Sequence, residues 1–265
     1  MYIKEQIMPE PKDIRSKRRF GPIITEVELH DDITNALIKM TDTLIEDKKT
    51  KSFGKHLAGV IDKELVIHKE DLYEAGCDDF FERCVQNYVI ECIAKKMYDQ
   101  GLNFNTDDYD ITSSINACWV VSQYENEYNP IHDHVGCNIS AVLYLKVPDY
   151  KDRRKIDSKV DKQDHDGDIN FVYNITPSDS LETGVVKFTA KPGFLIIFPS
   201  NLLHSVYPFI GEGERRSISF NAVYTANTFN KETRERKYFS GNQLYPIHTQ
   251  HTSKKQKKIE KKYNV

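Results

Sequence analysis

The sequence has no long hydrophobic run, few cysteines and no leader-like start. No stretch of the 265 residues is long and apolar enough to cross a bilayer. Residues 1–20 are charged and contain no apolar segment of the kind found in secretory signals. The five cysteines are odd in number and include no Cys-x-x-Cys pair, which is typical of reduced thiols. We therefore expect a cytoplasmic protein with no membrane partner.

Several common functional motifs are also missing. The chain has no internal repeat, no glycine-rich phosphate loop and no Gly-x-Ser-x-Gly nucleophile motif. Lys and Arg (37) nearly balance Asp and Glu (40), so the net charge of -3 makes nucleic acid an unlikely partner. A Lys-rich run occupies residues 254–262, and we interpret it as a solvated tail.

The length fits one large domain or a core with an appendage. The pattern changes along the chain suggest four parts. These are an N-terminal arm (1–20), a helical support region packed on the core (21–110), a β-rich catalytic core (111–230) and a C-terminal extension with the Lys-rich tail (231–265).

Two amphipathic helices are predicted in the support region. One begins at Asp31-Asp32 and has an apolar face that runs from Ile33 to Ile45. The other begins at Asp78-Asp79, and Gly101 lies where a helix-ending residue is expected. Residues 47–77 have weak periodicity and are predicted to be mostly loop.

From residue 115 the pattern changes to short strands separated by turns, which predicts a mainly β sandwich or barrel of the α+β class. A charged, turn-rich insertion occupies residues 149–167. The predicted strands are 115–124, 129–135, 138–147, 168–174, 183–188, 193–199, 203–209 and 215–225.

A pair of histidines lies on one of these strands. Alternate side chains of a strand share a face, so His132 and His134 point the same way and Asp133 points the other way. His204 lies on a distant strand that could close beside them. Three imidazoles on one face make a metal site with open positions, suited to divalent iron.

A polar face on a later strand accompanies the histidines. Arg215, Ser217, Ser219 and Asn221 alternate along residues 215–225 and share one side. A planar, permanently charged guanidinium is well suited to bind a carboxylate. Arg216 is the alternative anchor, although the alternation groups it with Ile218 instead.

These residues resemble the iron(II)- and 2-oxoglutarate-dependent dioxygenase superfamily, within which the sequence is similar to a little-characterised family of phage and bacterial oxygenases related to prolyl hydroxylases. The resemblance implies a double-stranded β-helix, a jelly-roll or cupin-like barrel. It implies Fe(II) and 2-oxoglutarate as cofactors, O2 as a co-substrate and, for a phage-encoded protein, the host cytoplasm as location. The stretches that carry it are residues 124–134, 139–145, 166–171 and 191–224.

The resemblance also implies roles for single positions. His132 and His204 resemble the two histidine ligands, and His134 stands where the superfamily usually has Asp or Glu. Asp133 is the rival ligand if a bulge turns it inward. The residues that resemble the groups holding 2-oxoglutarate are Arg215, Ser217, Tyr144 and Tyr124.

The implied reaction is oxidative decarboxylation of 2-oxoglutarate to succinate and CO2, coupled to hydroxylation of a peptidyl side chain or a small metabolite. One alternative is a three-histidine, cupin-type dioxygenase that uses no 2-oxoglutarate. Another is a non-catalytic barrel that acts as a binding or virion-associated module. The sequence leaves the primary substrate and the oligomeric state open.

Overall fold

The computed structural model describes residues 13–18, 21–150, 166–173, 184–229 and 236–240. The Lys-rich run at 254–262 and most of the charged insertion lie outside the described residues. Among the helices of the described part, none is long and apolar enough to cross a membrane.

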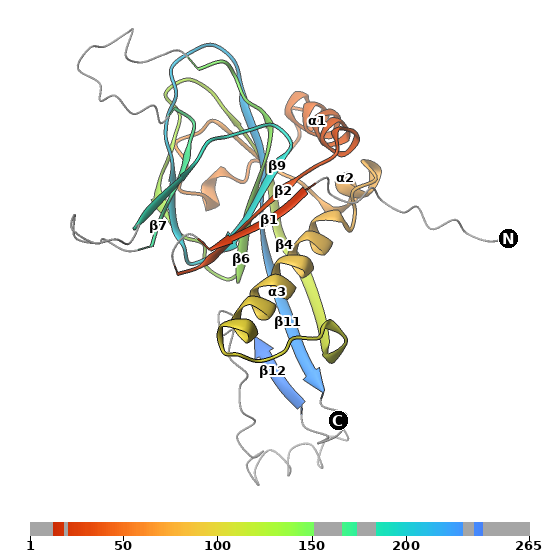
Figure 1. Ribbon diagram of the computed structural model, residues 1–265. Helices are drawn as coiled ribbons and strands as arrows, with labels where there is room; N and C mark the ends of the chain where they lie inside the picture. The colour runs from red at the N-terminus through yellow and green to blue at the C-terminus, as the bar shows by residue number, and fades with distance from the viewer. Residues whose placement is uncertain (1–12, 19–20, 151–165, 174–183, 230–235, 241–265) are drawn as a thin grey trace, which may run out of the picture.

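Two antiparallel sheets form the body of the protein (Figure 1). The large sheet has the strand order β1-β2-β9-β6-β11-β4-β3, with β12 also paired to β11, and the small sheet has the order β5-β10-β7-β8. The large-sheet strands are β1 (Asp13–Arg18), β2 (Ile23–Glu28), β3 (Lys63–Val66), β4 (Tyr109–Gln123), β6 (Ile139–Lys146), β9 (Phe194–Pro199), β11 (Arg215–Phe229) and β12 (Arg236–Ser240). The small-sheet strands are β5 (Asn129–His132), β7 (Ile169–Val172), β8 (Val185–Phe188) and β10 (Leu203–Val206).

The chain passes repeatedly between the two sheets. From β4 to β11 it places β4, β6, β9 and β11 in the large sheet and β5, β7, β8 and β10 in the small one. This eight-stranded, two-sheet order is a double-stranded β-helix, or jelly roll. The predicted fold class is therefore confirmed. The expected closure into a barrel is not found among the described strands, which remain in two separately hydrogen-bonded sheets.

The continuous apolar sequence of β6 is explained by burial on both of its faces. Ile139, Ala141 and Leu143 pack in the core between the large sheet and the helices. Val142 and Tyr144 pack in a second core, which also holds residues of both sheets. A strand covered on both sides needs apolar residues at consecutive positions rather than at alternate ones.

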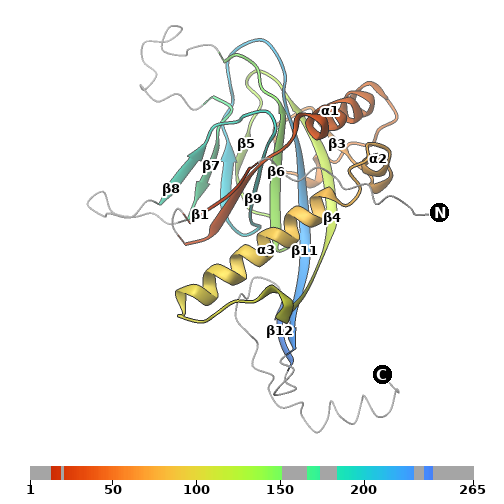
Figure 2. The ribbon, with the colours of Figure 1, turned by 45° about the vertical axis from the view of Figure 1, so that its right-hand side comes forward.

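Both predicted helices are confirmed. They are α1 (Asp31–Glu46) and α3 (Phe80–Asp99), and α3 crosses the strands of the large sheet diagonally (Figure 2). Phe81 of α3 packs on Phe220 of β11, with ring centroids 4.8 Å apart. After α3, Gly101 adopts a φ of 70°, a left-handed conformation that glycine accommodates without steric cost.

Several segments differ from the prediction. β4 begins six residues before the predicted strand, and β12 was not predicted. Residues 47–77 were expected to be loop, but they contain β3, a 3-10 turn at Gly54–His56 and the short helix α2 (Lys69–Glu74). The predicted N-terminal arm (1–20) contains β1, which pairs with β2. The strand predicted over 129–135 ends at His132. The proposed four-part domain division stays a prediction.

Candidate active site

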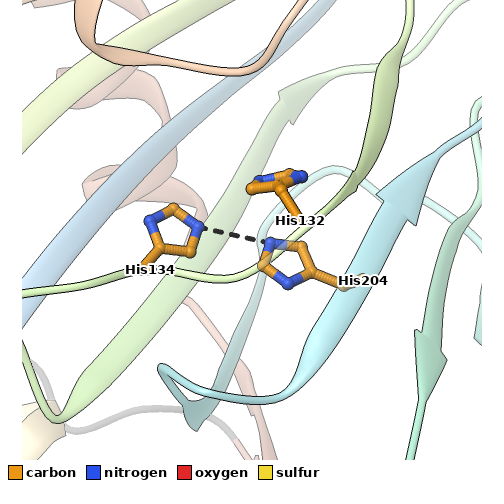
Figure 3. A group of neighbouring side chains, drawn as sticks. All are labelled: His132, His134 and His204. Atoms are coloured by element: carbon orange, nitrogen blue, oxygen red, sulfur yellow. Dashed lines mark hydrogen bonds between the residues drawn. The ribbon is translucent and has the colours of Figure 1, made fainter.

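Three histidines converge between the two sheets (Figure 3). His132 ends β5 and lies directly opposite His204 of β10 in the strand register, so their side chains point to the same side of the small sheet. The ring centroids of these two residues are 4.2 Å apart, and that of His134 is 5.2 Å from His132 and 5.1 Å from His204. One nitrogen from each ring lies within 4.8 Å of the other two.

Backbone carbonyls hold two of the rings in one tautomer. His132 Nδ1 lies 2.7 Å from the carbonyl oxygen of Pro130, and His204 Nδ1 lies 2.8 Å from that of Leu202. Since a carbonyl only accepts, each Nδ1 carries the proton and donates. Each Nε2 is then unprotonated and carries a lone pair, as in metal-binding histidines. In this structure the Nε2 of His204 accepts a hydrogen bond from the Nε2 of His134 at 3.3 Å (Figure 3), so His134 carries its proton on Nε2.

His134 reaches the group from a loop rather than from the predicted strand. Its backbone N–H donates to the carbonyl of Ser200 at 2.9 Å, and its ring stacks against Trp119 at a centroid distance of 6.1 Å. Asp133 is exposed and is not a member of the ligating group. The geometry therefore brings together the three predicted imidazoles and leaves Asp133 outside.

The spacing and protonation of the rings suit a divalent cation. The Nε2 atoms of His134 and His204 lie 3.3 Å apart. Ligand nitrogens at about 2.1 Å from one ion and at right angles to each other stand about 3 Å apart. Burial and the neighbouring His132 lower the pKa of His204 to about 3 and that of His134 to about 4. Both rings are therefore neutral near pH 7, as metal ligands must be.

Arg215 is a buried cation without a full set of partners. Its side chain is 2% exposed, and its Nε and Nη1 donate at 3.0 Å to the carbonyl of Gly167 and to Gln123 Oε1. Both acceptors are neutral. Its Nη2 is buried and has no hydrogen-bond partner among the described residues. The Nη2 donor is therefore available to a hydrogen-bond acceptor that enters the pocket.

Two tyrosine hydroxyls add further unpaired donors near Arg215. The hydroxyls of Tyr144 and Tyr150 are buried and lack hydrogen-bond partners in the described part of the chain. The guanidinium carbon of Arg215 lies 4.9 Å from the ring centroid of Tyr144. Burial raises the pKa of Tyr144 to about 12 even though the charge of Arg215 opposes this shift, so the hydroxyl keeps its proton and can donate.

Arg216 lies on the other face of the large sheet and is fully engaged there. Its Nε and Nη2 donate to Glu214 at 2.7 Å each, and its Nη1 donates to Asp42 of α1 at 2.6 Å. These ion pairs tie β11 to the covering helix. Arg216 is placed to stabilise the fold rather than to bind a ligand in the pocket.

A single pocket joins the histidines to Arg215. Its enclosed volume of about 50 Å³ is well below that of usual small-molecule sites, so the pocket must widen to admit a ligand. Its polar lining comprises Glu64, Asn129, His132, His134, His204, Arg215, Ser217 and Ser219. A larger, mostly apolar cavity of about 400 Å³, beside α3, includes none of the three histidines.

Of the remaining predicted site residues, some line the pocket and others do not. Ser217 lines the pocket. Tyr144 is absent from the pocket lining, although its ring lies beside Arg215, which does line it. Tyr124 is also absent from the lining, is 41% exposed and has Lys63 above its ring at 6.0 Å. Sequence reasoning missed Glu64, Gln123 and Tyr150. Gln123 ends a recognised strand, so its pairing with Arg215 could have been inferred, whereas Glu64 and Tyr150 gave no signal.

Comparison with known proteins supports the predicted family. Residues 117–221 match the model of a family described as "Putative 2OG-Fe(II) oxygenase". This segment contains the three histidines, Arg215 and Ser217, and the match confirms the resemblance to iron(II)- and 2-oxoglutarate-dependent oxygenases. The phage or bacterial origin stays a prediction. No curated protein matches the chain.

Solved structures give only distant likenesses. A Pseudomonas putida prolyl-4-hydroxylase is 18% identical, over 75% of this chain and 91% of its own, with a TM-score of 0.45. A Trichoplax adhaerens prolyl hydroxylase, in complex with a hypoxia inducible factor peptide fragment, is 16% identical over 75% and 82%, with a TM-score of 0.44. A 2OG-Fe(II) oxygenase family oxidoreductase from Burkholderia pseudomallei is 14% identical over 42% of this chain and 43% of its own, with a TM-score of 0.30.

Proposed function

We propose that this protein is an iron(II)- and 2-oxoglutarate-dependent oxygenase that hydroxylates a peptidyl side chain or a small metabolite. The observation that carries the proposal is the presence, in one pocket, of three convergent imidazoles and a buried guanidinium with an unpaired donor. The imidazoles suit a divalent metal, and the guanidinium suits a carboxylate. The family match over residues 117–221 supports the same function.

The chain's own residues divide the work of binding. The Nε2 atoms of His132 and His204, together with the ring of His134, would hold Fe(II). The distal carboxylate of 2-oxoglutarate would be held at Arg215 Nη2, with hydroxyl support from Ser217, Tyr144 and Tyr150. With O2 as the oxidant, bound iron and 2-oxoglutarate would supply an oxidative decarboxylation in which one oxygen atom enters succinate, CO2 is released, and the other oxygen atom hydroxylates the substrate.

The surroundings of His204 exclude water from one side of the site. Its side chain is only 4% exposed, and its ring packs edge-on against Phe198 at a centroid distance of 4.9 Å and near Phe171 at 5.9 Å. An apolar surface that excludes water strengthens electrostatic interactions in the site and keeps solvent from competing with a ligand. It also fixes the ring, so that its lone pair is directed toward the other two imidazoles.

Anaerobic titration with iron(II) and 2-oxoglutarate tests the proposal directly. We expect the weak visible absorption band of an iron–2-oxoglutarate chelate, which does not depend on the unknown substrate. His204→Gln should lose the band, and the control His30→Gln, which alters a histidine at the start of α1 whose side chain makes no capping hydrogen bond, should keep it. Absence of the band from the wild-type protein would overturn the proposal.

A three-histidine dioxygenase without 2-oxoglutarate is the second candidate. The observation that favours it is the third imidazole, which occupies the place of the carboxylate ligand usual in 2-oxoglutarate-dependent oxygenases. Three neutral imidazoles leave the metal site one charge unit more positive than two imidazoles and a carboxylate. Such an enzyme has no use for an unpaired guanidinium in its pocket. Succinate release on adding iron(II), 2-oxoglutarate and air would exclude this candidate, and a failure to bind iron would instead favour a non-catalytic module.

A further inference from the structure

A buried carboxylate lies in the candidate active site, and neither metal binding nor 2-oxoglutarate binding uses it. Glu64 belongs to β3, the edge strand of the large sheet, and is 2% exposed. It is paired in register with Val121 of β4, which is paired in turn with Ser217 of β11. All three residues line the pocket. Glu64 therefore lies on the inward face, in the same row of the sheet as Ser217.

The carboxyl group of Glu64 lacks a full set of hydrogen-bond partners among the described residues. Its Oε2 is buried and makes no hydrogen bond to the described residues. Burial, together with the nearby charge of Glu127, raises the pKa of Glu64 from 4.5 to about 7. Glu127 is itself held by the backbone N–H groups of Asp62 and Tyr124, at 2.9 and 2.7 Å. Burial and the neighbouring acid both disfavour the charged form of Glu64, and a cation bound beside it would favour that form.

The backbone at Gly54 and Gly59 lies close to the carboxyl group of Glu64 and forms one wall of a subsite. A β-carbon added at Gly59 would lie 2.8 Å from Glu64 Oε1 and 2.6 Å from Asn129 Oδ1. One added at Gly54 would lie 3.2 Å from Glu64 Oε2. Val60 donates its N–H to the carbonyl of Tyr128 at 2.9 Å, which fastens this segment to the chain just before β5. Two hydrogen-bond acceptors, Glu64 Oε1 and Asn129 Oδ1, therefore both lie beside Gly59.

The pocket is therefore lined by a basic and an acidic side chain that come from two different strands. Arg215 of β11 offers an unpaired donor, and Glu64 of β3 offers an unpaired acceptor. The proposed co-substrate is a dianion, which complements Arg215 and leaves Glu64 without a counterion. A second ligand with a positive, hydrogen-donating group would satisfy Glu64 and the oxygen of Asn129 together.

We infer that Glu64, assisted by Asn129, binds a cationic nitrogen group of the primary substrate, an ammonium or guanidinium such as a lysine-like or arginine-like side chain carries. The inference rests on the proposed function for the identity of the site and adds the chemical class of the substrate. Glu64 acts here as a specificity-determining residue. The three histidines and Arg215 bind their own ligands without it.

The test uses small probes, because the substrate itself is unidentified. Protein loaded anaerobically with iron(II) and 2-oxoglutarate is titrated in a calorimeter with ethylguanidinium or propylammonium, and with the neutral counterparts ethylurea and 1-propanol. We expect the cations to bind at least about tenfold more tightly, as charged hydrogen bonds require. Glu64→Gln should remove this preference, whereas Glu91→Gln, which alters an exposed acid of α3, should keep it.

Gly59→Ala is a second variant that leaves the carboxylate in place. Its added methyl group meets Glu64 Oε1 and Asn129 Oδ1, so we expect cation binding to fall as in Glu64→Gln. The chelate band should persist in both variants and report that they are folded. Equal binding of cationic and neutral probes by the wild-type protein overturns the inference even if Glu64→Gln does not fold.

The outcomes separate this inference from the proposed function. A chelate band in the wild-type protein with no cation preference refutes only the role of Glu64. A cation preference that survives Glu64→Gln also refutes it, because the cation then binds elsewhere. If the band is absent from the wild-type protein, the proposed function fails, and with it the claim that the cation belongs to an oxygenase substrate.

Discussion

Arg215 and Arg216 are neighbours on β11, yet their guanidinium groups lie on opposite faces of the large sheet. Arg215 lines the pocket and keeps one unpaired donor, whereas Arg216 is held by Glu214 and by Asp42 of α1. The alternation of side chains along a strand produces this division. One arginine is thereby left available for a ligand while the other is used by the fold.

The first prediction compares alanine substitutions at these two positions. Arg215→Ala should weaken 2-oxoglutarate binding about 10- to 100-fold, because it removes charge-assisted hydrogen bonds worth about 1.5–3 kcal/mol. Arg216→Ala should leave that affinity nearly unchanged but lower the free energy of unfolding by about 3 kcal/mol, because it breaks a largely buried ion-pair network. Titration of the chelate band and urea denaturation measure the two effects. Equal losses of affinity would contradict the assignment of the two faces.

The sequence was sufficient to predict the parts of this site that lie on regular elements. The alternation along β11 placed Arg215 and Ser217 on one face, and the structure has both in the pocket. The apolar stripe of α3 and its terminal glycine predicted a helix that is present. These features depend on local periodicity, which a single sequence displays directly.

Other parts depend on long-range contacts that have no local pattern. β3 is four residues long and buries an acid, Glu64, so its sequence shows no apolar alternation. His134 is positioned by a bond to the carbonyl of Ser200, which is distant in the sequence. Tyr150 lies at the start of the predicted charged insertion (149–167), and its proximity to Arg215 follows only from the folded chain. Tertiary contacts decided each of these positions.

The second prediction concerns the third metal ligand. His134→Ala should abolish the chelate band, because only two of the three convergent imidazoles would remain. Asp133→Asn should leave the band intact, because Asp133 is exposed and outside the ligating group. His134→Asp should retain iron, since two histidines and a carboxylate form an established iron site. Loss of the band in Asp133→Asn but not in His134→Ala would reverse the assignment.

The third prediction is a pH dependence of stability caused by Glu64. Its pKa is about 7 in the folded protein against an ordinary value of 4.5, so the folded state binds more protons between these two pH values. The stabilisation is complete below about pH 4.5 and is lost as the pH rises through 7. Because the folded-state pKa lies about 2.5 above the ordinary value and each whole step in pKa corresponds to about 1.4 kcal/mol, the loss is about 3.5 kcal/mol.

Urea denaturation of the ligand-free protein at several pH values between 5 and 8 measures this effect. Glu64→Gln should show a flatter profile than the wild-type protein, similar in stability at pH 5 and more stable at pH 8. Glu91→Gln, in which the altered acid is exposed, should follow the wild-type profile. Parallel profiles for all three proteins would show that Glu64 ionises normally in the folded state.

The fourth prediction is that Tyr144→Phe has opposite effects on stability and on ligand binding. The Tyr144 hydroxyl is buried without a partner in the described structure, so its removal should stabilise the ligand-free protein by about 1 kcal/mol. The same hydroxyl is available to the 2-oxoglutarate carboxylate, so its removal should weaken that binding about tenfold. Tyr88→Phe is the control, because the Tyr88 hydroxyl already donates to the carbonyl of Ile23 at 3.0 Å, and its loss should destabilise the protein without changing affinity. If Tyr144→Phe destabilises the ligand-free protein, the hydroxyl has a partner there and is not held in reserve for a ligand.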